Sequence, residues 1–168
     1  PRPGKMDFPK YPTEFSMMNF DRNNKMTDRY VDQDRKGVKM MQDIWMQLAS
    51  MGAKAPPMPV HVIDSFIKDV KFQTDQIRAR GGEIVFLRPP SSGPLWKGEQ
   101  MGFPRDKFWE KILTVTGSKG MHFADHAELS KMNCTEFSHL RQSDTKIFTQ
   151  KVVEVLSKEM GWKFKAGN

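Results

Sequence analysis

The chain has 168 residues, which suits one domain with a sizeable core. Its 38% hydrophobic and 28% charged residues are typical of a folded globular protein and not of a disordered one. No apolar run approaches the roughly 20 residues that a membrane-spanning helix requires. A single cysteine, Cys134, excludes an internal disulfide and a cysteine-rich zinc module. The net charge of +7 comes from interleaved positive and negative residues, which disfavours a nucleic-acid-binding surface.

The first third of the chain predicts an irregular segment followed by one helix. Residues 1–33 mix proline, asparagine and aromatic residues without a sustained period. From Asp34 to Gly52, by contrast, apolar residues recur every three or four positions, as in an amphipathic helix. The proline-rich residues 54–59 predict a stiff connector. We therefore expect residues 1–58 to form one unit and residues 59–168 to form a second.

Helices and strands alternate through the second unit. The pattern predicts a helix that begins at Val60 or Asp64 and ends at Arg80, with Phe66, Ile67, Val70 and Ile77 facing inward. The remaining predicted elements are a strand over 83–88, a loop over 89–102, a helix over 104–116, a strand over 121–123 and a helix over 143–160, capped by Ser143. This order favours an α/β fold with a mainly parallel sheet, whose first strand is apolar enough to be covered on both faces. Two or three strands are few for this length, so we expect an incomplete domain.

A carboxylate and a histidine stand three residues apart just before the last predicted helix. Glu136 could accept a hydrogen bond from one ring nitrogen of His139, leaving the other nitrogen to take a proton from a nucleophile. That arrangement supplies two members of a hydrolytic triad. The alternative is a surface turn whose histidine packs beside the helix.

The loop after the 83–88 strand offers a second set of candidates. In open α/β sheets, sites form beyond the carboxyl ends of the strands. There Arg88 could hold an oxygen-rich substrate, and the backbone around Ser91 and Ser92 could help to stabilise an oxyanion. The alternative is that Arg88 pairs with a nearby acid while the serines form a turn.

A metal site is a further alternative for the segment from His122 to His139. This segment holds three histidines, three acidic residues and Cys134 within 18 residues. The spacing matches no common zinc pattern, and no cofactor is expected.

The second half of the chain resembles the C-terminal part of SGNH (GDSL-type) hydrolases, in the bacterial group related to acyltransferase-like esterases. The residues that carry the resemblance are the strand and loop 84–93, the helix start 103–109, residues 120–125, the turn 134–140 and the helix start 143–149. The resemblance implies a three-layer fold, with helices flanking a mainly parallel sheet. It also implies that His139 is the general base, that Glu136 orients it, and that Arg88, Ser91 and Ser92 lie near the substrate.

Two departures from this family define what the chain lacks. The family's acid is usually aspartate, whereas this chain has Glu136, which is one methylene longer. The Gly-Asp-Ser turn that carries the family's nucleophile does not occur, and neither does its Gly-x-Asn-Asp block. Because the chain begins at Pro1 without a methionine, we expect the nucleophilic serine to lie upstream, and this chain alone to be inactive.

These observations lead to one main expectation and one principal rival. The main expectation is a serine ester hydrolase or O-acyltransferase, represented by its C-terminal portion and acting on a small-molecule or polysaccharide ester. The resemblance also suggests a location outside the cytoplasm. The rival is a non-catalytic accessory or interaction domain on the same fold, in which His139 is structural. Neither expectation includes nucleic acid or a membrane span, and neither fixes the oligomeric state.

Overall fold

The computed structural model describes residues 18–20, 26–28, 35–54 and 56–164. Two short strands, β1 (Met18–Phe20) and β2 (Met26–Asp28), pair in antiparallel fashion within the segment that we expected to be irregular. The rest of that expectation lies outside the described residues. Helix α2 (Arg35–Ala53) follows and confirms the amphipathic helix predicted from Asp34.

Helix α3 (Val60–Ala79) forms as predicted and ends where the backbone turns into a left-handed conformation. Gly81 has φ 81°, and its N–H donates to the carbonyl of Arg78, while the N–H of Gly82 donates to the carbonyl of Ile77. A residue without a Cβ adopts this conformation readily, which is why glycine ends many helices. The inward face is only partly as predicted, because Ile67 is buried whereas Phe66 and Ile77 are exposed.

The structure has a parallel sheet of two strands, β3 (Val85–Arg88) and β4 (Lys119–His122). Val85 pairs with Lys119, and Arg88 pairs with His122, so these last two residues lie together at the carboxyl ends. Parallel pairing was predicted, but full cover of the first strand was not correct, because Leu87 is 43% exposed.

The connection between these strands contains two helices, of which only one was predicted. Helix α4 (Gly93–Gly102) occupies most of the segment expected to be a loop, and α5 (Trp109–Thr116) begins five residues later than expected. A composition of proline, serine and glycine suggested a loop. However, Pro94 lies in the first turn of α4, where a missing N–H leaves no helical hydrogen bond unmade.

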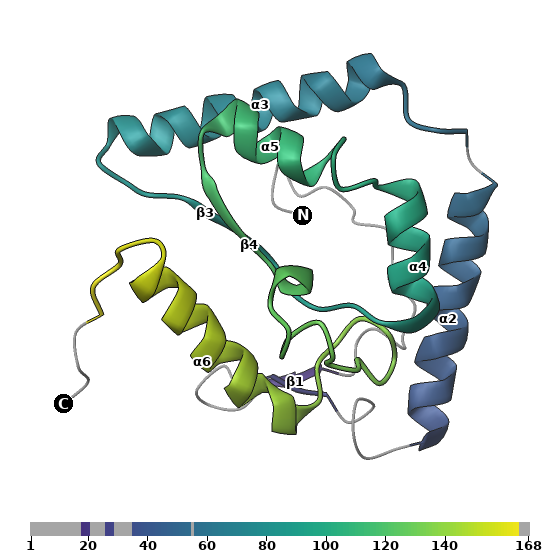
Figure 1. Ribbon diagram of the computed structural model, residues 1–168. Coiled ribbons are helices and arrows are strands. Elements are labelled where there is room, and N and C mark those ends of the chain that lie inside the picture. Colours follow the sequence, from purple (N-terminus) through teal and green to yellow (C-terminus); the bar gives the residue numbers. More distant parts are fainter. Residues whose placement is uncertain (1–17, 21–25, 29–34, 55, 165–168) are drawn as a thin grey trace, which may run out of the picture.

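Helix α6 (Gln142–Lys158) completes the fold, after a 3₁₀ turn, η2 (Phe123–Asp125). The N-cap of α6 is Arg141, so the expected capping by Ser143 is wrong; the Ser143 hydroxyl bonds to Asp144 within the first turn. Helices lie on both sides of the two strands, with α6 on one side and α3 and α5 on the other (Figure 1). The fold is therefore a mixed helical and parallel-strand arrangement.

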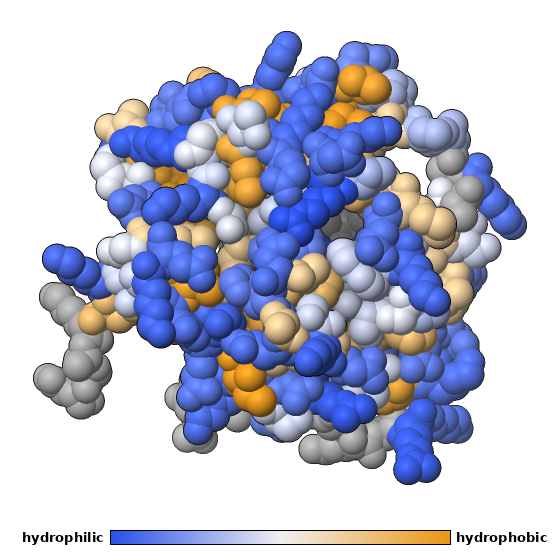
Figure 2. Space-filling view, viewed as in Figure 1, coloured by the Kyte–Doolittle hydropathy of each residue, from blue (hydrophilic) through white to orange (hydrophobic). Residues whose placement is uncertain are grey.

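Buried side chains gather between the sheet and α6. Met121 and Phe123 pack there with Leu129 and Val155, and Trp96 and Phe148 cover the edge of this cluster. On the other side of the sheet the backbone approaches α5 closely at Gly120, where a Cβ would lie 2.7 Å from Leu113 and Trp109. The face shown in Figure 2 mixes hydrophobic and hydrophilic side chains, as expected from the interleaved charges.

Candidate functional site: a buried carboxylate and its histidine

The turn before α6 brings Glu136 and His139 together. The Nδ1 atom of His139 lies 2.8 Å from Oε1 of Glu136, and the backbone N–H of His139 donates to the same oxygen at 2.5 Å. With a carboxylate as its partner, Nδ1 carries the proton of the neutral ring, and Nε2 carries the basic lone pair. The pairing predicted from the spacing is thus present in the structure.

Glu136 is held on all sides. The side chain of Glu136 is 1% exposed, whereas the side chain of His139 is 37% exposed. The indole N–H of Trp45, on α2, donates to Oε2 at 2.5 Å, and the N–H and hydroxyl of Ser138 donate to the carboxylate at 2.9 to 3.2 Å. A carboxylate with so many donors is fixed in position and cannot rotate away from the ring.

These donors also set the charge of the acid. Burial is the largest influence and by itself would raise the pKa of Glu136. The hydrogen bond and charge of His139, and the hydrogen bonds from Trp45 and Ser138, together outweigh burial and hold that pKa below its usual value. Glu136 is therefore ionised at neutral pH and can orient an imidazole.

An unusual backbone conformation creates this convergence. Phe137 has φ 80°, in the left-handed region that a bulky residue rarely adopts, and the turn there directs the next two N–H groups toward Glu136. The Phe137 ring packs over Gly93, where a Cβ would lie 3.0 Å from the ring. A glycine at the start of α4 thus leaves space for the strained residue.

The loop after β3 is bonded to the same turn. The N–H of Ser92 donates to the carbonyl of Phe137 at 2.9 Å, and the Ser92 hydroxyl bonds to both the carbonyl and the N–H of Cys134. Ser92 therefore holds the histidine turn against the end of β3. Its N–H, considered above as an oxyanion donor, already has an acceptor.

Arg88 and Ser91 form a separate cluster with an acid that we did not predict. The guanidinium of Arg88 lies 2.5 Å from Glu99, on α4, and 3.0 Å from the Ser91 hydroxyl, which itself donates to Glu99 at 2.6 Å. The geometry is that of an arginine paired with a nearby acid, the alternative considered for Arg88. Both residues remain at the carboxyl end of β3.

Cys134 is a buried thiol within the turn. Its Sγ lies 3.4 Å from the carbonyl of Pro90, and burial, followed by the charge of Glu136, raises its pKa to about 11. A thiol with this pKa stays protonated at neutral pH, so Cys134 does not suit the role of nucleophile.

The structure does not support the metal-binding alternative. No group of three or more histidine, cysteine, aspartate and glutamate side chains with metal-binding geometry occurs among the residues that the structure describes. Asp125 instead pairs with Arg105, and Nδ1 of His122 accepts the N–H of Ala124.

Trp45 and Ser138 are the functional candidates that the sequence did not reveal. Trp45 lies 91 residues from Glu136 in the chain, and no local pattern predicts such a contact. Ser138 is adjacent to His139, but the direction of its hydroxyl depends on the positive φ of Phe137. Because this hydroxyl lies 2.8 Å from Nδ1, on the side of the carboxylate, it supports the pair and is not placed as a nucleophile for Nε2.

Comparison with models of known protein families, with curated proteins and with solved structures finds no match to this chain. The helices within the described ranges also include none with the length and apolarity needed to cross a bilayer.

Proposed function

We propose that this chain supplies the histidine and acid of a serine-type ester hydrolase or O-acyltransferase of the SGNH kind. The observation that carries the proposal is the 2.8 Å contact between His139 Nδ1 and a completely buried, ionised Glu136. A merely structural surface turn has no need of a buried carboxylate with donors from three residues.

In the proposed reaction, His139 moves protons and Glu136 keeps it oriented. Nε2 takes the proton of a serine hydroxyl as the serine oxygen adds to the ester carbonyl. Collapse of the tetrahedral intermediate breaks the bond to the alcohol, which leaves with that proton. Water in a hydrolase, or an acceptor hydroxyl in a transferase, then attacks the acyl-serine by the same steps and regenerates the serine.

The position of the pair relative to the sheet supports this proposal. Ser92 bonds the histidine turn to the loop that leaves the carboxyl end of β3, the edge of an α/β sheet where sites usually form. We propose that Ser92 positions the turn, and that Arg88 and Ser91 shape the neighbouring substrate region through their contacts with Glu99. We propose that the reacting serine is not among the residues of this chain. The proposed substrate is a small-molecule or polysaccharide ester, and the proposed location is extracytoplasmic.

The test uses the full-length protein and a fluorophosphonate probe, which labels serines activated by a base. We expect one serine to be labelled, and we expect His139→Ala to lower both labelling and hydrolysis of short acyl esters by at least about 1,000-fold. His61→Ala is the matched control, because His61 is exposed and lies on α3, away from the turn.

Two results would contradict the proposal. Undiminished ester turnover in His139→Ala would remove His139 from the mechanism. Absence of any labelled serine in the folded full-length protein would favour the rival function, an accessory or interaction domain.

A further inference from the structure

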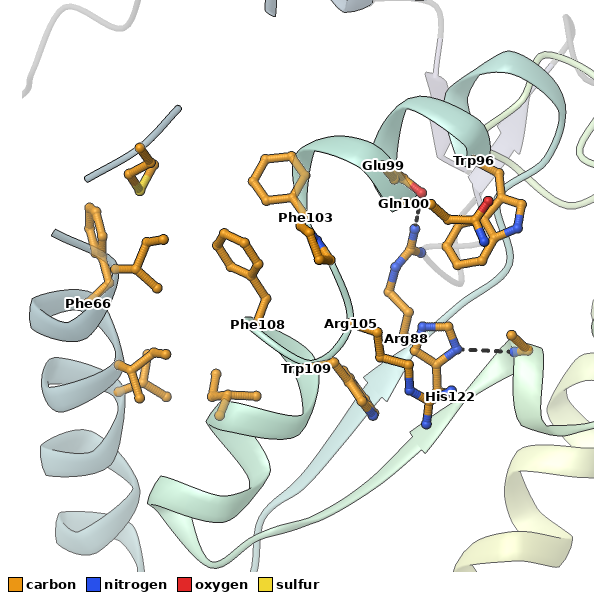
Figure 3. A pocket seen from close by; sticks show the side chains of 17 residues that line it. Phe66, Arg88, Trp96, Glu99, Gln100, Phe103, Arg105, Phe108, Trp109 and His122 are labelled. Carbon is orange, nitrogen blue, oxygen red and sulfur yellow. Dashed lines mark hydrogen bonds and ion pairs between the residues drawn. The ribbon is translucent and has the colours of Figure 1, made fainter. Parts of the chain in front are cut away.

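A large cavity lies on the opposite side of the sheet from α6. Its volume is about 810 Å³, within the range of small-molecule sites. Helix α3 forms one wall, with Phe66, Ile67 and Val70, and the segment from α4 to α5 forms the other, with Phe103 and Phe108 (Figure 3). These walls are apolar over most of their length.

The cavity has one polar end, at the carboxyl ends of β3 and β4. His122 lies there, 5% exposed, with its ring packed between Trp109 and Phe123. Nδ1 accepts the N–H of Ala124 at 3.1 Å, so the hydrogen of the neutral ring is on Nε2. Among the described residues, every fully buried side-chain nitrogen or oxygen has a hydrogen-bond partner. His122 Nε2 has no such partner among them, so this atom is not fully buried. We conclude that Nε2–H is accessible from the cavity and can donate to a ligand.

The charged side chains near this end are already paired with one another. Arg88 pairs with Glu99 at 2.5 Å, and Arg105 pairs with Asp125 at 2.6 and 2.8 Å and with Glu110 at 2.6 Å. These two cations face three carboxylates, so an anionic ligand would have to displace an existing pair. Burial, followed by the charge of Arg105, lowers the pKa of His122, and the ring is therefore neutral at pH 7.

We propose that this cavity binds an uncharged small molecule with an extended apolar body and one hydrogen-bond acceptor, such as a medium-chain acyl ester or amide. The apolar body would lie between α3 and the α4–α5 segment, and the acceptor would take the hydrogen of His122 Nε2. Neither Glu136 nor His139 lines the cavity, so this inference stands independently of the proposed catalysis.

The first experiment measures binding of N-phenyl-1-naphthylamine, an uncharged fluorophore, to the full chain. We expect saturable binding, weakened at least about threefold by Phe66→Ala, because that change removes part of the apolar wall. Phe72→Ala is the matched control and should change the dissociation constant less than about twofold. Both phenylalanines are on α3, and they are 61% and 59% exposed, but only Phe66 lines the cavity.

The second experiment tests the polar end by competition. We expect N,N-dimethyloctanamide, which resists hydrolysis, to displace the fluorophore at least about tenfold more effectively than octanoate. We expect His122→Asn, which keeps an acceptor for the Ala124 N–H but loses Nε2–H, to weaken the amide at least about threefold. The same variant should leave binding of the fluorophore within about twofold, because the fluorophore offers no strong acceptor.

Three outcomes would overturn the inference. Lack of saturable binding by the unmodified chain would mean that another segment or a second copy covers the cavity. Equal weakening by Phe66→Ala and Phe72→Ala would indicate unspecific adsorption to exposed aromatic rings. Octanoate competing as well as the amide would exclude the uncharged ligand class.

Discussion

At the scale of single residues, the site depends on the hydrogen bonds that a buried glutamate, Glu136, accepts from other parts of the protein. Its two oxygens receive hydrogen bonds from the backbone and side chains of Ser138 and His139 and from the indole of Trp45. A buried carboxylate is stable only when it is paired and hydrogen-bonded in this way. The glutamate side chain reaches both the local donors and Trp45 on the distant helix α2.

Replacing the distant donor tests this account. Trp45→Phe keeps an aromatic ring but removes the hydrogen bond to Oε2 of Glu136. We expect the free energy of unfolding to fall by about 1–3 kcal/mol, because a buried charged acceptor loses a partner. Chemical denaturation at pH 7 measures this change, and Trp162→Phe, the same substitution at another tryptophan, is the control. Equal losses of unfolding free energy in the two variants would show that the Trp45 hydrogen bond does not contribute to stability.

The buried thiol gives a second prediction at this scale. Cys134 lies against the carbonyl of Pro90, and burial raises its pKa to about 11. We expect iodoacetamide at pH 8 to alkylate the native protein at least about 100-fold more slowly than the denatured protein, since the thiolate is the reactive form. Mass spectrometry of timed samples measures both rates. Similar rates would mean that the turn opens readily.

The residues of the site were only partly predictable from the sequence. The spacing of Glu136 and His139 was sufficient to predict their contact, because residues three apart in a turn can meet without help from the rest of the fold. The contact with Trp45 depends on how α2 packs, and the role of Glu99 depends on α4, a helix that we did not predict. Long-range partners of this kind leave no periodic signal in a single sequence.

At the scale of elements, strong hydrophobic periodicity predicted helices and strands correctly, whereas composition alone wrongly predicted a loop. Helices α2, α3 and α6 and both parallel strands were expected near their observed bounds. Helix α4 was missed because its glycines and proline suggested a loop, although proline fits the first turn of a helix. The three-layer arrangement stays a proposal, because the described sheet has two strands.

A matched pair of glycines tests how elements pack. In β4, a Cβ at Gly120 would lie 2.7 Å from Leu113 and Trp109, so we expect Gly120→Ala to lower the free energy of unfolding by about 1–3 kcal/mol. In α4, nothing lies within 4 Å of a Cβ at Gly98, so we expect Gly98→Ala to raise it by about 0.5–1 kcal/mol. Denaturant titration compares the two. Destabilisation by both changes would contradict the assigned helix.

At the scale of the whole molecule, α2 links the two units expected from the sequence. Helix α2 packs beside α4 (Figure 1), Gln42 donates to the carbonyl of Thr135, and Trp45 donates to Glu136. Helix α2, which belongs to the first of the two expected units, therefore contributes directly to the turn that carries His139. If the proposed function holds, damage to α2 should reduce activity without touching a reacting atom.

Two buried groups give the stability of the whole molecule a pH dependence of the same sign. The pKa of His122 lies below its usual value of 6.5, because of burial and then Arg105, so below this pH the unfolded chain takes up the proton first. The pKa of Glu136 also lies below its usual value of 4.5, so its stabilising contribution is present above pH 4.5 and is lost as the pH falls through the native pKa. In both cases the unfolded state binds more protons in acid, and stability rises with pH.

We therefore expect the free energy of unfolding to be nearly constant between about pH 7 and pH 8 and to fall in two stages as the pH decreases. The first stage begins near pH 6.5 and belongs to His122, while the second begins near pH 4.5 and includes Glu136. Denaturant titrations from about pH 2.5 to pH 8 measure both stages. In His122→Asn the first stage should shrink and the second should remain, because asparagine does not titrate but keeps an acceptor for the N–H of Ala124. An unchanged first stage in this variant would show that another group, and not the imidazole at the end of the cavity, controls stability between these values.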